Sequence, residues 1–167
     1  VYPHPFLYDG KFGNNGWLHE LPHPITKVVW DNYAALSPAT AKKFNLKNGD
    51  VIQLDNGRKK INIPVFIQAG VSDDMVCVET GYGREECGEI GKDIGFNVQF
   101  LINKNSDSPY FSYVNVNKTN EKYNLVTAQE HHSLDDTFVK DFHKKRKIIQ
   151  EGTIKQFEND PDFVQRE

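Results

Sequence analysis

Cysteine is scarce in this chain, which has only two in 167 residues. Cys77 and Cys87 do not form a Cys-x-x-Cys pair, so we expect no zinc site or iron–sulfur cluster within the chain. Cys77 lies in an apolar alternating run and is expected to be buried, whereas Cys87 lies in a polar loop. A disulfide between them is the less favoured alternative to two free thiols.

Long apolar runs and an excess of positive charge are also lacking. No run approaches the roughly 20 apolar residues that span a bilayer, so we expect a soluble fragment with no direct membrane insertion. Lys and Arg number 20 against 23 Asp and Glu, a net charge of −3, so nucleic acid is not an expected partner. The chain opens on Val1-Tyr2-Pro3-His4-Pro5 without an initiator Met, and we interpret it as an excerpt from a longer polypeptide.

Short apolar runs separated by turn residues are plentiful and predict a small, mainly β structure. Ser37-Pro38 predicts the start of a helix over 39–44, and Asp55-Asn56-Gly57 predicts a hairpin. Pro64 predicts that the returning strand lies at an edge or carries a bulge. Strands are predicted at 28–30, 51–54, 60–67, 75–80, 97–102, 110–116 and 123–127. Many short strands with one short helix favour a small β barrel.

Composition divides the chain into three parts. Residues 1–27 are rich in Pro, Gly, His and Asn and are predicted to form an entry loop anchored by Phe12 and Trp17-Leu18. Residues 28–128 hold the predicted barrel. Residues 129–167 are highly charged and predict a tail that is partly helical or disordered.

The glycine loop that follows the strand at 75–80 is the main candidate for a binding site. Gly81-Tyr82-Gly83-Arg84 is followed by Gly88, Gly91 and Gly95, and repeated glycines after a strand indicate a shaped loop. A Rossmann nucleotide site is excluded, because its spacing requires glycine at the position of Glu86 and no helix obviously follows. Glu85, Glu86 and Glu89 lie in the same loop and would repel a phosphate.

An ordered set of motifs carries a resemblance to a known family. The motifs are Tyr8-Asp9-Gly10-Lys11, Asn14-Asn15-Gly16-Trp17-Leu18-His19-Glu20-Leu21-Pro22, Thr26-Lys27-Val28-Val29-Trp30-Asp31-Asn32, Leu36-Ser37-Pro38, Thr40-Ala41, Asn48-Gly49-Asp50-Val51, Gly81-Tyr82-Gly83-Arg84 and Gly95-Phe96-Asn97. Together they resemble the C-terminal dinucleotide-binding domain of the molybdopterin oxidoreductase family over roughly residues 8–128. More narrowly, they resemble the branch that includes the molybdopterin/iron–sulfur subunit of bacterial alternative complex III, a quinol-oxidising membrane complex.

The resemblance implies a fold, a cofactor and a setting. The fold would be a six-stranded double-psi β barrel, and the domain would hold the pterin and nucleotide portions of a molybdenum cofactor without catalysing a reaction. Residues 129–167 resemble the connector toward an iron–sulfur domain, so iron–sulfur clusters would lie in the missing part of the parent. The implied partners are the other domains of the polypeptide and the subunits of a bacterial membrane complex, on its periplasmic face.

The family pattern places cofactor contacts in two regions of this chain. The predicted cofactor-binding residues are Lys11, Asn14, Asn15, Trp17, Gly81, Tyr82, Gly83, Arg84, Gly95 and Asn97. Asn side chains offer donors and an acceptor to the amide-like edge of a pterin or guanine, and Lys11 and Arg84 can meet phosphate. The same residues also have purely structural interpretations as turns, barrel bends and ion pairs, and Trp17 is expected to be a buried core anchor rather than a stacking ring.

Two functions of different class remain open. The first is a cofactor-binding module of a molybdopterin-dependent oxidoreductase, and the second is a cofactor-free scaffold domain of a quinol-oxidising respiratory complex. No catalytic constellation is predicted. A metal site at His131, His132 and His143 is conceivable, but exposed connector histidines are the favoured interpretation.

Overall fold

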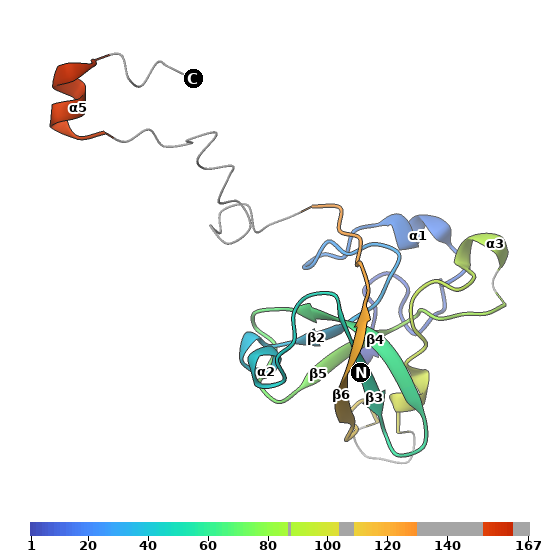
Figure 1. Cartoon of the computed structure of the whole chain (residues 1–167). Helices are drawn as coiled ribbons and strands as arrows, with labels where there is room; N and C mark the ends of the chain where they lie inside the picture. Colours follow the sequence, from blue (N-terminus) through green and yellow to red (C-terminus); the bar gives the residue numbers. More distant parts are fainter. Residues whose placement is uncertain (87, 104–108, 130–151, 162–167) are drawn as a thin grey trace. The chain divides into compact units, whose positions relative to one another are not determined.

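The computed structural model describes residues 1–86, 88–103, 109–129 and 152–161 (Figure 1). Its contacts divide the chain into two units, Val1–Ala128 and Gln129–Glu167. The second unit contains helix α5 (Ile154–Asn159), which begins with a capping box in which the Thr153 hydroxyl accepts from the Gln156 backbone N–H and the Gln156 side chain accepts from the Thr153 backbone N–H. Cys87, His131, His132 and His143 lie outside the described residues.

Six strands of the first unit form one sheet in the order β1-β5-β2-β4-β3-β6. Their bounds are β1 (Tyr2–Pro3), β2 (Ala34–Leu36), β3 (Asp50–Asp55), β4 (Lys60–Ile67), β5 (Val76–Thr80) and β6 (Asn115–Lys122). The pairs β1–β5 and β2–β4 are parallel, and the other three pairs are antiparallel. In the described residues the sheet is not closed, with β1 and β6 at its two ends. The mainly β, six-stranded prediction is therefore confirmed, the predicted barrel closure is not observed, and the double-psi connectivity stays a prediction.

The β3–β4 hairpin forms where the sequence predicts it. The ladder runs from Val51 opposite Pro64 to Asp55 opposite Lys60. In the turn, the Asp55 carboxylate accepts from the Gly57 backbone N–H at 2.7 Å. β4 is not an edge strand, which corrects the prediction from Pro64. Pro64 is tolerated because it lies where the ladder with β3 ends and the ladder with β2 begins at Val65.

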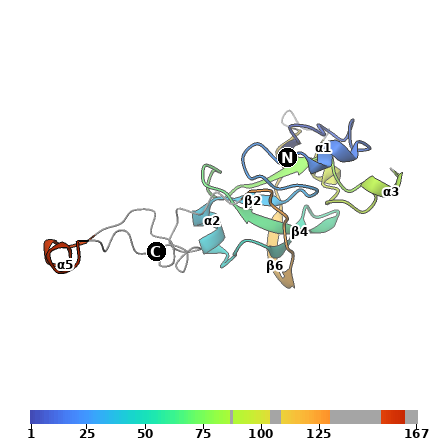
Figure 2. The ribbon, with the colours of Figure 1, turned by 90° about the horizontal axis from the view of Figure 1, so that it is seen from above.

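Helix α2 (Pro38–Lys43) also begins where predicted. The hydroxyl of Ser37 accepts from the Thr40 backbone N–H at 3.0 Å, and Pro38 occupies the first helical position. Figures 1 and 2 show that α2 lies at one side of this unit, away from helices α1 (Gly16–Glu20) and α3 (Gly88–Gly91), which are close together. In the described residues no helix is long and apolar enough to cross a membrane.

Four strand predictions are wrong. The 28–30 segment makes only a single bridge, from Val28 to Thr127, and the 97–102 run contains the 3₁₀ helix η1 (Gln99–Leu101). The predicted strands at 110–116 and 123–127 are replaced by the single strand β6 at 115–122. Strands β1 and β2 were not predicted. β2 is only three residues long and fully buried, and β6 is mostly polar and exposed, so neither shows the usual alternation.

The core lies on the sheet and beneath the η1 segment. Its larger cluster contains Ala34, Leu36, Ala41, Leu46, Ile52, Leu54, Ile63, Val65, Val78, Val98 and Leu101. Residues 98–101 therefore contribute apolar side chains to the core although they are not a strand. This packing fixes the position of the chain just after the glycine loop.

Candidate functional site

Helix α1 and the loop before it form one side of the candidate site. The Asn15 side chain caps α1 by accepting from the Trp17 backbone N–H at 3.1 Å. The Trp17 side chain is 83% exposed, so the expectation that it is a buried anchor is wrong. Trp17 is the second residue of a five-residue helix whose buried residue is His19. It is available to stack on a ligand.

Arg84 joins the two regions that the sequence assigns to the site. Its Nη1 donates to the Asn14 side-chain oxygen at 2.9 Å, and its Nη2 donates to the Gly10 carbonyl. The guanidinium also packs against Gly13, where a Cβ would lie 3.1 Å from Nε. Residues 10–14 and 81–84 are therefore one surface, although Arg84 is far from Gly10 in the sequence.

Two glycines bring the rest of the loop together. A Cβ on Gly83 would lie 2.1 Å from the Asn97 backbone nitrogen, and Gly83 has a φ of +75°. A Cβ on Gly95 would lie 2.7 Å from the Tyr82 ring, and Gly95 has a φ of +64°. Both positions therefore require glycine for close approach of chain to chain. The loop is packed on itself, and its ligand-facing groups are the exposed side chains at its surface.

The other predicted residues differ in whether they reach that surface. Asn97 is exposed, and its side-chain oxygen accepts from the Gln99 backbone N–H at 3.1 Å. Lys11 is exposed with its Nζ 5.3 Å from the centre of the Phe12 ring. Tyr82 is buried, and Gly81 is buried beneath it. Tyr82 therefore supports the loop from inside and does not offer its ring to a ligand.

Asn32 is a buried residue whose side-chain hydrogen bonds hold the glycine loop in place. It was not predicted as a site residue. Its side-chain Nδ2 donates to the carbonyls of Glu79 at 2.8 Å and Phe96 at 2.9 Å. Its Oδ1 accepts from the Phe96 backbone N–H at 2.7 Å. The side chain thus ties the end of β5 to the 95–97 turn. A lone amide in the apolar run from Val28 to Leu36 was the signal for it.

Asp31, the neighbour of Asn32 in the chain, has a carboxyl group whose pKa is shifted. Burial raises its pKa to about 6, although hydrogen bonds from the Tyr123 hydroxyl and the Gly95 backbone N–H oppose the rise. The Tyr123 oxygen lies 3.0 Å from both carboxylate oxygens. Asp31 therefore links the 95–97 turn to the chain that follows β6.

A second unpredicted group consists of buried ionisable side chains. Glu79 of β5 lies between His23, whose Nε2 is 3.0 Å from Oε1, and His4, whose Nε2 is 3.7 Å from Oε2. All three side chains are buried. Burial lowers the pKa of His4 to about 4 and raises the pKa of Tyr82. The signal in the sequence was the tripeptide Pro-His-Pro, which occurs at 3–5 and again at 22–24.

The surface charge of the loop is acidic. Glu85, Glu86 and Glu89 are all exposed, and Lys11 is the exposed cation of the facing loop. Across the part of the chain that the structure describes, no group of three or more His, Cys, Asp or Glu side chains has the geometry to hold a metal ion.

Comparison with known proteins identifies the domain. A family model described as the molybdopterin ("molydopterin") dinucleotide binding domain matches residues 14–133. The chain belongs to this family. The match begins at Asn14 and contains the glycine loop and Asn97, whereas Lys11 lies before it. Asn32, which ties the loop together, also falls inside the match.

Two curated relatives carry related names. Over 72 residues the chain is 35% identical to the menaquinone reductase molybdopterin-binding-like subunit of Nitratidesulfovibrio vulgaris, a match of 43% of this chain and 10% of that protein. Over 82 residues it is 28% identical to the thiosulfate reductase molybdopterin-containing subunit of Salmonella typhimurium, a match of 48% of this chain and 11% of that protein. The matches thus span about a tenth of each relative's length.

The exposed groups of this domain fit part of a pterin dinucleotide. The side chains of Asn14 and Asn97 present amides, which pair with the amide-like edges of pterin and guanine, and Trp17 presents an uncovered ring. The phosphates fit less well. Lys11 is an exposed cation, but Arg84 already donates to the chain's own oxygens.

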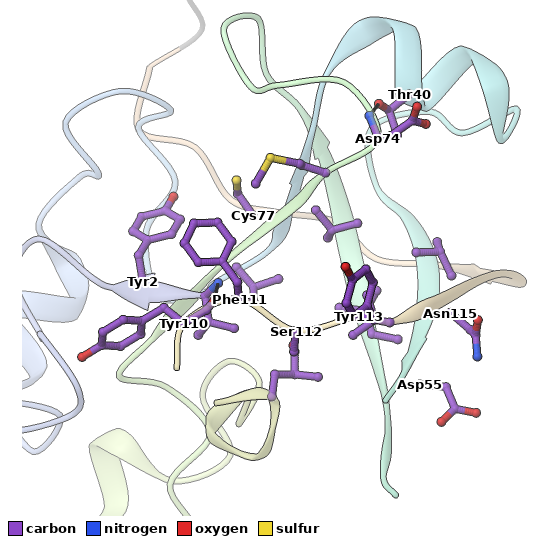
Figure 3. A pocket seen from close by; sticks show the side chains of 18 of the residues that line it. Tyr2, Thr40, Asp55, Asp74, Cys77, Tyr110, Phe111, Ser112, Tyr113 and Asn115 are labelled. Atoms are coloured by element: carbon purple, nitrogen blue, oxygen red, sulfur yellow. Dashed lines mark hydrogen bonds between the residues drawn. The ribbon is translucent and has the colours of Figure 1, made fainter. Parts of the chain in front are cut away.

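A separate cavity of about 1170 Å³ is lined by β5, part of β3 and the 110–117 segment (Figure 3). Figure 3 shows Tyr2, Cys77 and Phe111 around one part of it and Tyr113 and Asn115 around another. Its lining carboxylates are paired, Asp74 with Lys43 at 2.6 Å and Asp55 with Lys60 at 3.3 Å. Cys77 is a half-buried free thiol in this wall. None of the predicted cofactor residues lines this cavity.

Proposed function

We propose that this domain binds the pterin and nucleotide portions of a molybdenum cofactor on the surface formed by residues 10–17, 81–86 and 95–97. The observation that carries the proposal is the Arg84 contact with Gly10 and Asn14, which brings the two family-assigned regions into one surface. The family to which the chain belongs supports the choice of ligand. The domain acts as a binding module and is not itself catalytic.

Each exposed side chain has a defined part in this binding. The amides of Asn14 and Asn97 would donate to and accept from the edges of the pterin and guanine rings. The ring of Trp17 would cover one face of a bound ring, which removes apolar area of both from water. Lys11 would contact a phosphate oxygen. When bound, the cofactor supplies the redox chemistry at its metal, and this domain holds and orients its organic part.

The parent protein is proposed from the same resemblance. We propose an electron-transfer protein in which the six strands follow the double-psi arrangement and the segment after residue 128 leads to an iron–sulfur domain. Its partners would be the other domains of the polypeptide and the subunits of a bacterial respiratory membrane complex, with this domain on the periplasmic face. The relative named as a menaquinone reductase subunit supports a respiratory setting.

A cofactor-free scaffold is the second candidate, and one observation favours it. Glu85 and Glu86 are exposed on the proposed binding surface, and Glu89 is exposed in helix α3, which follows it in the chain. A carboxylate about 4 Å from a pyrophosphate oxygen would oppose binding by about 1 kcal/mol in water, and a more distant one by less. In this alternative the domain would keep the fold and dock other subunits of a quinol-oxidising complex without holding a cofactor.

Titration of the chain with a molybdopterin–guanine dinucleotide fragment, followed by NMR, distinguishes the two candidates. The indole N–H signal of the exposed Trp17 should shift with ligand, while that of Trp30, which stacks on buried His19, should not. Trp17→Ala should weaken binding about tenfold, as expected for loss of one stacked ring. Tyr113→Ala removes another highly exposed ring, which lines the separate cavity, and should not change the affinity. No shift at millimolar ligand favours the scaffold.

A further inference from the structure

Two copies of one local turn meet inside this domain. In each, a histidine between two prolines accepts two backbone N–H groups on its Nδ1. For His4 the donors are Phe6 and Leu7, both at 3.2 Å. For His23 the donors are Ile25 and Thr26, again both at 3.2 Å, and the Thr26 hydroxyl oxygen lies 3.2 Å from the same nitrogen. Proline after the histidine has no N–H of its own, so the two following N–H groups are the ones left to be satisfied.

These turns fix the tautomer of both rings. A nitrogen that accepts two N–H groups carries a lone pair, so the proton of each neutral ring must lie on Nε2. Both Nε2 atoms lie within 4 Å of the Glu79 carboxylate. His23 donates to Oε1 at 3.0 Å, and His4 donates to the Tyr82 oxygen at 3.3 Å while lying 3.7 Å from Oε2.

The same geometry argues against a metal at this cluster. Two histidines and one carboxylate are a familiar ligand set, but a ligating Nε2 must be free of its proton. That would require the proton to move to Nδ1, where each ring already faces two N–H donors. The cluster is therefore built to hold protons in place.

We propose that His4, His23 and Glu79 form an acid-sensitive latch that holds the two Pro-His-Pro turns on strand β5 and against the glycine loop. Protonation of either ring places an N–H on Nδ1, directly opposite two backbone N–H groups. The turn then loses both hydrogen bonds and gains repulsion between donors. Protonation of both rings would bury two cations beside a single carboxylate, which is costly in a site that excludes water.

Loss of the His4 contacts would affect the glycine loop through Tyr82. The hydroxyl of Tyr82 contacts His4, and its ring packs on Gly95. When His4 leaves, Tyr82 loses the partner that fixes its hydroxyl. The latch contacts do not involve the exposed side chains of the proposed binding surface. The latch can therefore be tested independently of the proposed function.

The other ionisable groups that face the latch are three tyrosines and one histidine. Tyr2 and Tyr33 face Glu79, and burial raises the pKa of both above the ordinary tyrosine value. Tyr82 behaves in the same way. His19 approaches His4 from α1, but its Nε2 donates to the Gly13 carbonyl at 2.9 Å, outside the latch.

The pH range of the latch follows from His4. Its pKa is lowered from 6.5 to about 4, mainly by burial, while the charge of Glu79 opposes the shift. A folded-state pKa below the unfolded one means that the latch contributes fully above pH 6.5. Its contribution is lost as the pH falls from 6.5 toward 4.

The test uses NMR on the 167-residue chain. At pH 7.5, long-range proton–nitrogen spectra should show both latch rings with the proton on Nε2. Between pH 7.5 and 4.5, the opening equilibria of the Phe6 and Leu7 amides in hydrogen exchange, corrected for intrinsic exchange, should rise by roughly 10- to 100-fold.

Variants separate the latch from general acid unfolding. In the double variant His4→Asn, His23→Asn, each Asn oxygen can accept the same two N–H groups but cannot be protonated, so the rise should disappear. The control variant His19→Asn should still show the rise in amide opening. An Nδ1–H tautomer of either latch ring at pH 7.5 would overturn the proposal even if the double variant does not fold. An undiminished rise in a folded double variant would also overturn it.

Discussion

Two sets of glutamates in this domain show how much burial changes the role of one residue type. Glu79 is buried between two histidines, whereas Glu85, Glu86 and Glu89 are exposed on the glycine loop only a few residues later. The buried carboxylate accepts defined hydrogen bonds and fixes the chain around it. The exposed carboxylates act through their field on any anion that approaches. Stability should therefore depend on the first set and ligand binding on the second.

The largest effect should come from Glu79→Ala. It leaves the Nε2–H of His23 buried without its acceptor and leaves a cavity beside His4, so we expect a loss of about 3–4 kcal/mol. Urea unfolding should show this loss. Glu86→Ala, at an exposed position, should change the free energy of unfolding by no more than about 0.5 kcal/mol. Equal losses in the two variants would remove the contrast between the sets.

A smaller loss is expected from Gly83→Ala. Its Cβ would overlap the Asn97 backbone, and its φ of +75° strains any residue with a side chain, so we expect a loss of about 2–3 kcal/mol. Gly57→Ala is the matched control, since Gly57 has a φ of +81° but open space around its Cβ position. The difference between the two variants in the free energy of unfolding measures the cost of crowding alone. Equal losses would show that the loop is not tightly packed on Asn97.

Asp31 should make the free energy of unfolding depend on pH in the opposite sense to His4. Its pKa is raised from 3.8 to about 6, so its contribution to stability is fully present below pH 3.8 and is lost as the pH rises through 6. Asp31→Asn should therefore stabilise the domain by about 1 kcal/mol at pH 8, after allowance for partial exposure and solvent screening. Thermal unfolding between pH 4 and 8 measures this. A variant that is less stable than the parent at pH 8 contradicts the assignment.

These contrasts also show what could be predicted from the sequence. Helix α2 and the β3–β4 hairpin were predicted because Ser37-Pro38 and Asp55-Asn56-Gly57 act within a few residues. The prediction that residues 10–17 and 81–97 share a site came from the order of the family motifs. The Glu79 contacts were missed because they join residues far apart in the chain, and local periodicity carries no information about such pairs. Trp17 was wrongly expected to be buried because aromatic residues usually are.

The smallest effect should come from the exposed set. Glu86→Gln with Glu89→Gln removes two exposed negative charges of the glycine loop without touching the core. Affinity for the dinucleotide fragment should rise by a few fold, equivalent to about 1 kcal/mol, and the gain should shrink at high salt. Calorimetric titration at two salt concentrations measures both. A gain that does not change with salt would point to a cause other than charge.

Metal and pterin analysis of the protein at its full natural length tests the central claim most directly. If this domain holds the organic part of a molybdenum cofactor, the purified protein should contain molybdenum or tungsten and pterin dinucleotide in amounts equal to the protein. Trp17→Ala should lower both together. An intact, folded protein with neither metal nor pterin would contradict the binding function and leave the scaffold as the role of this domain.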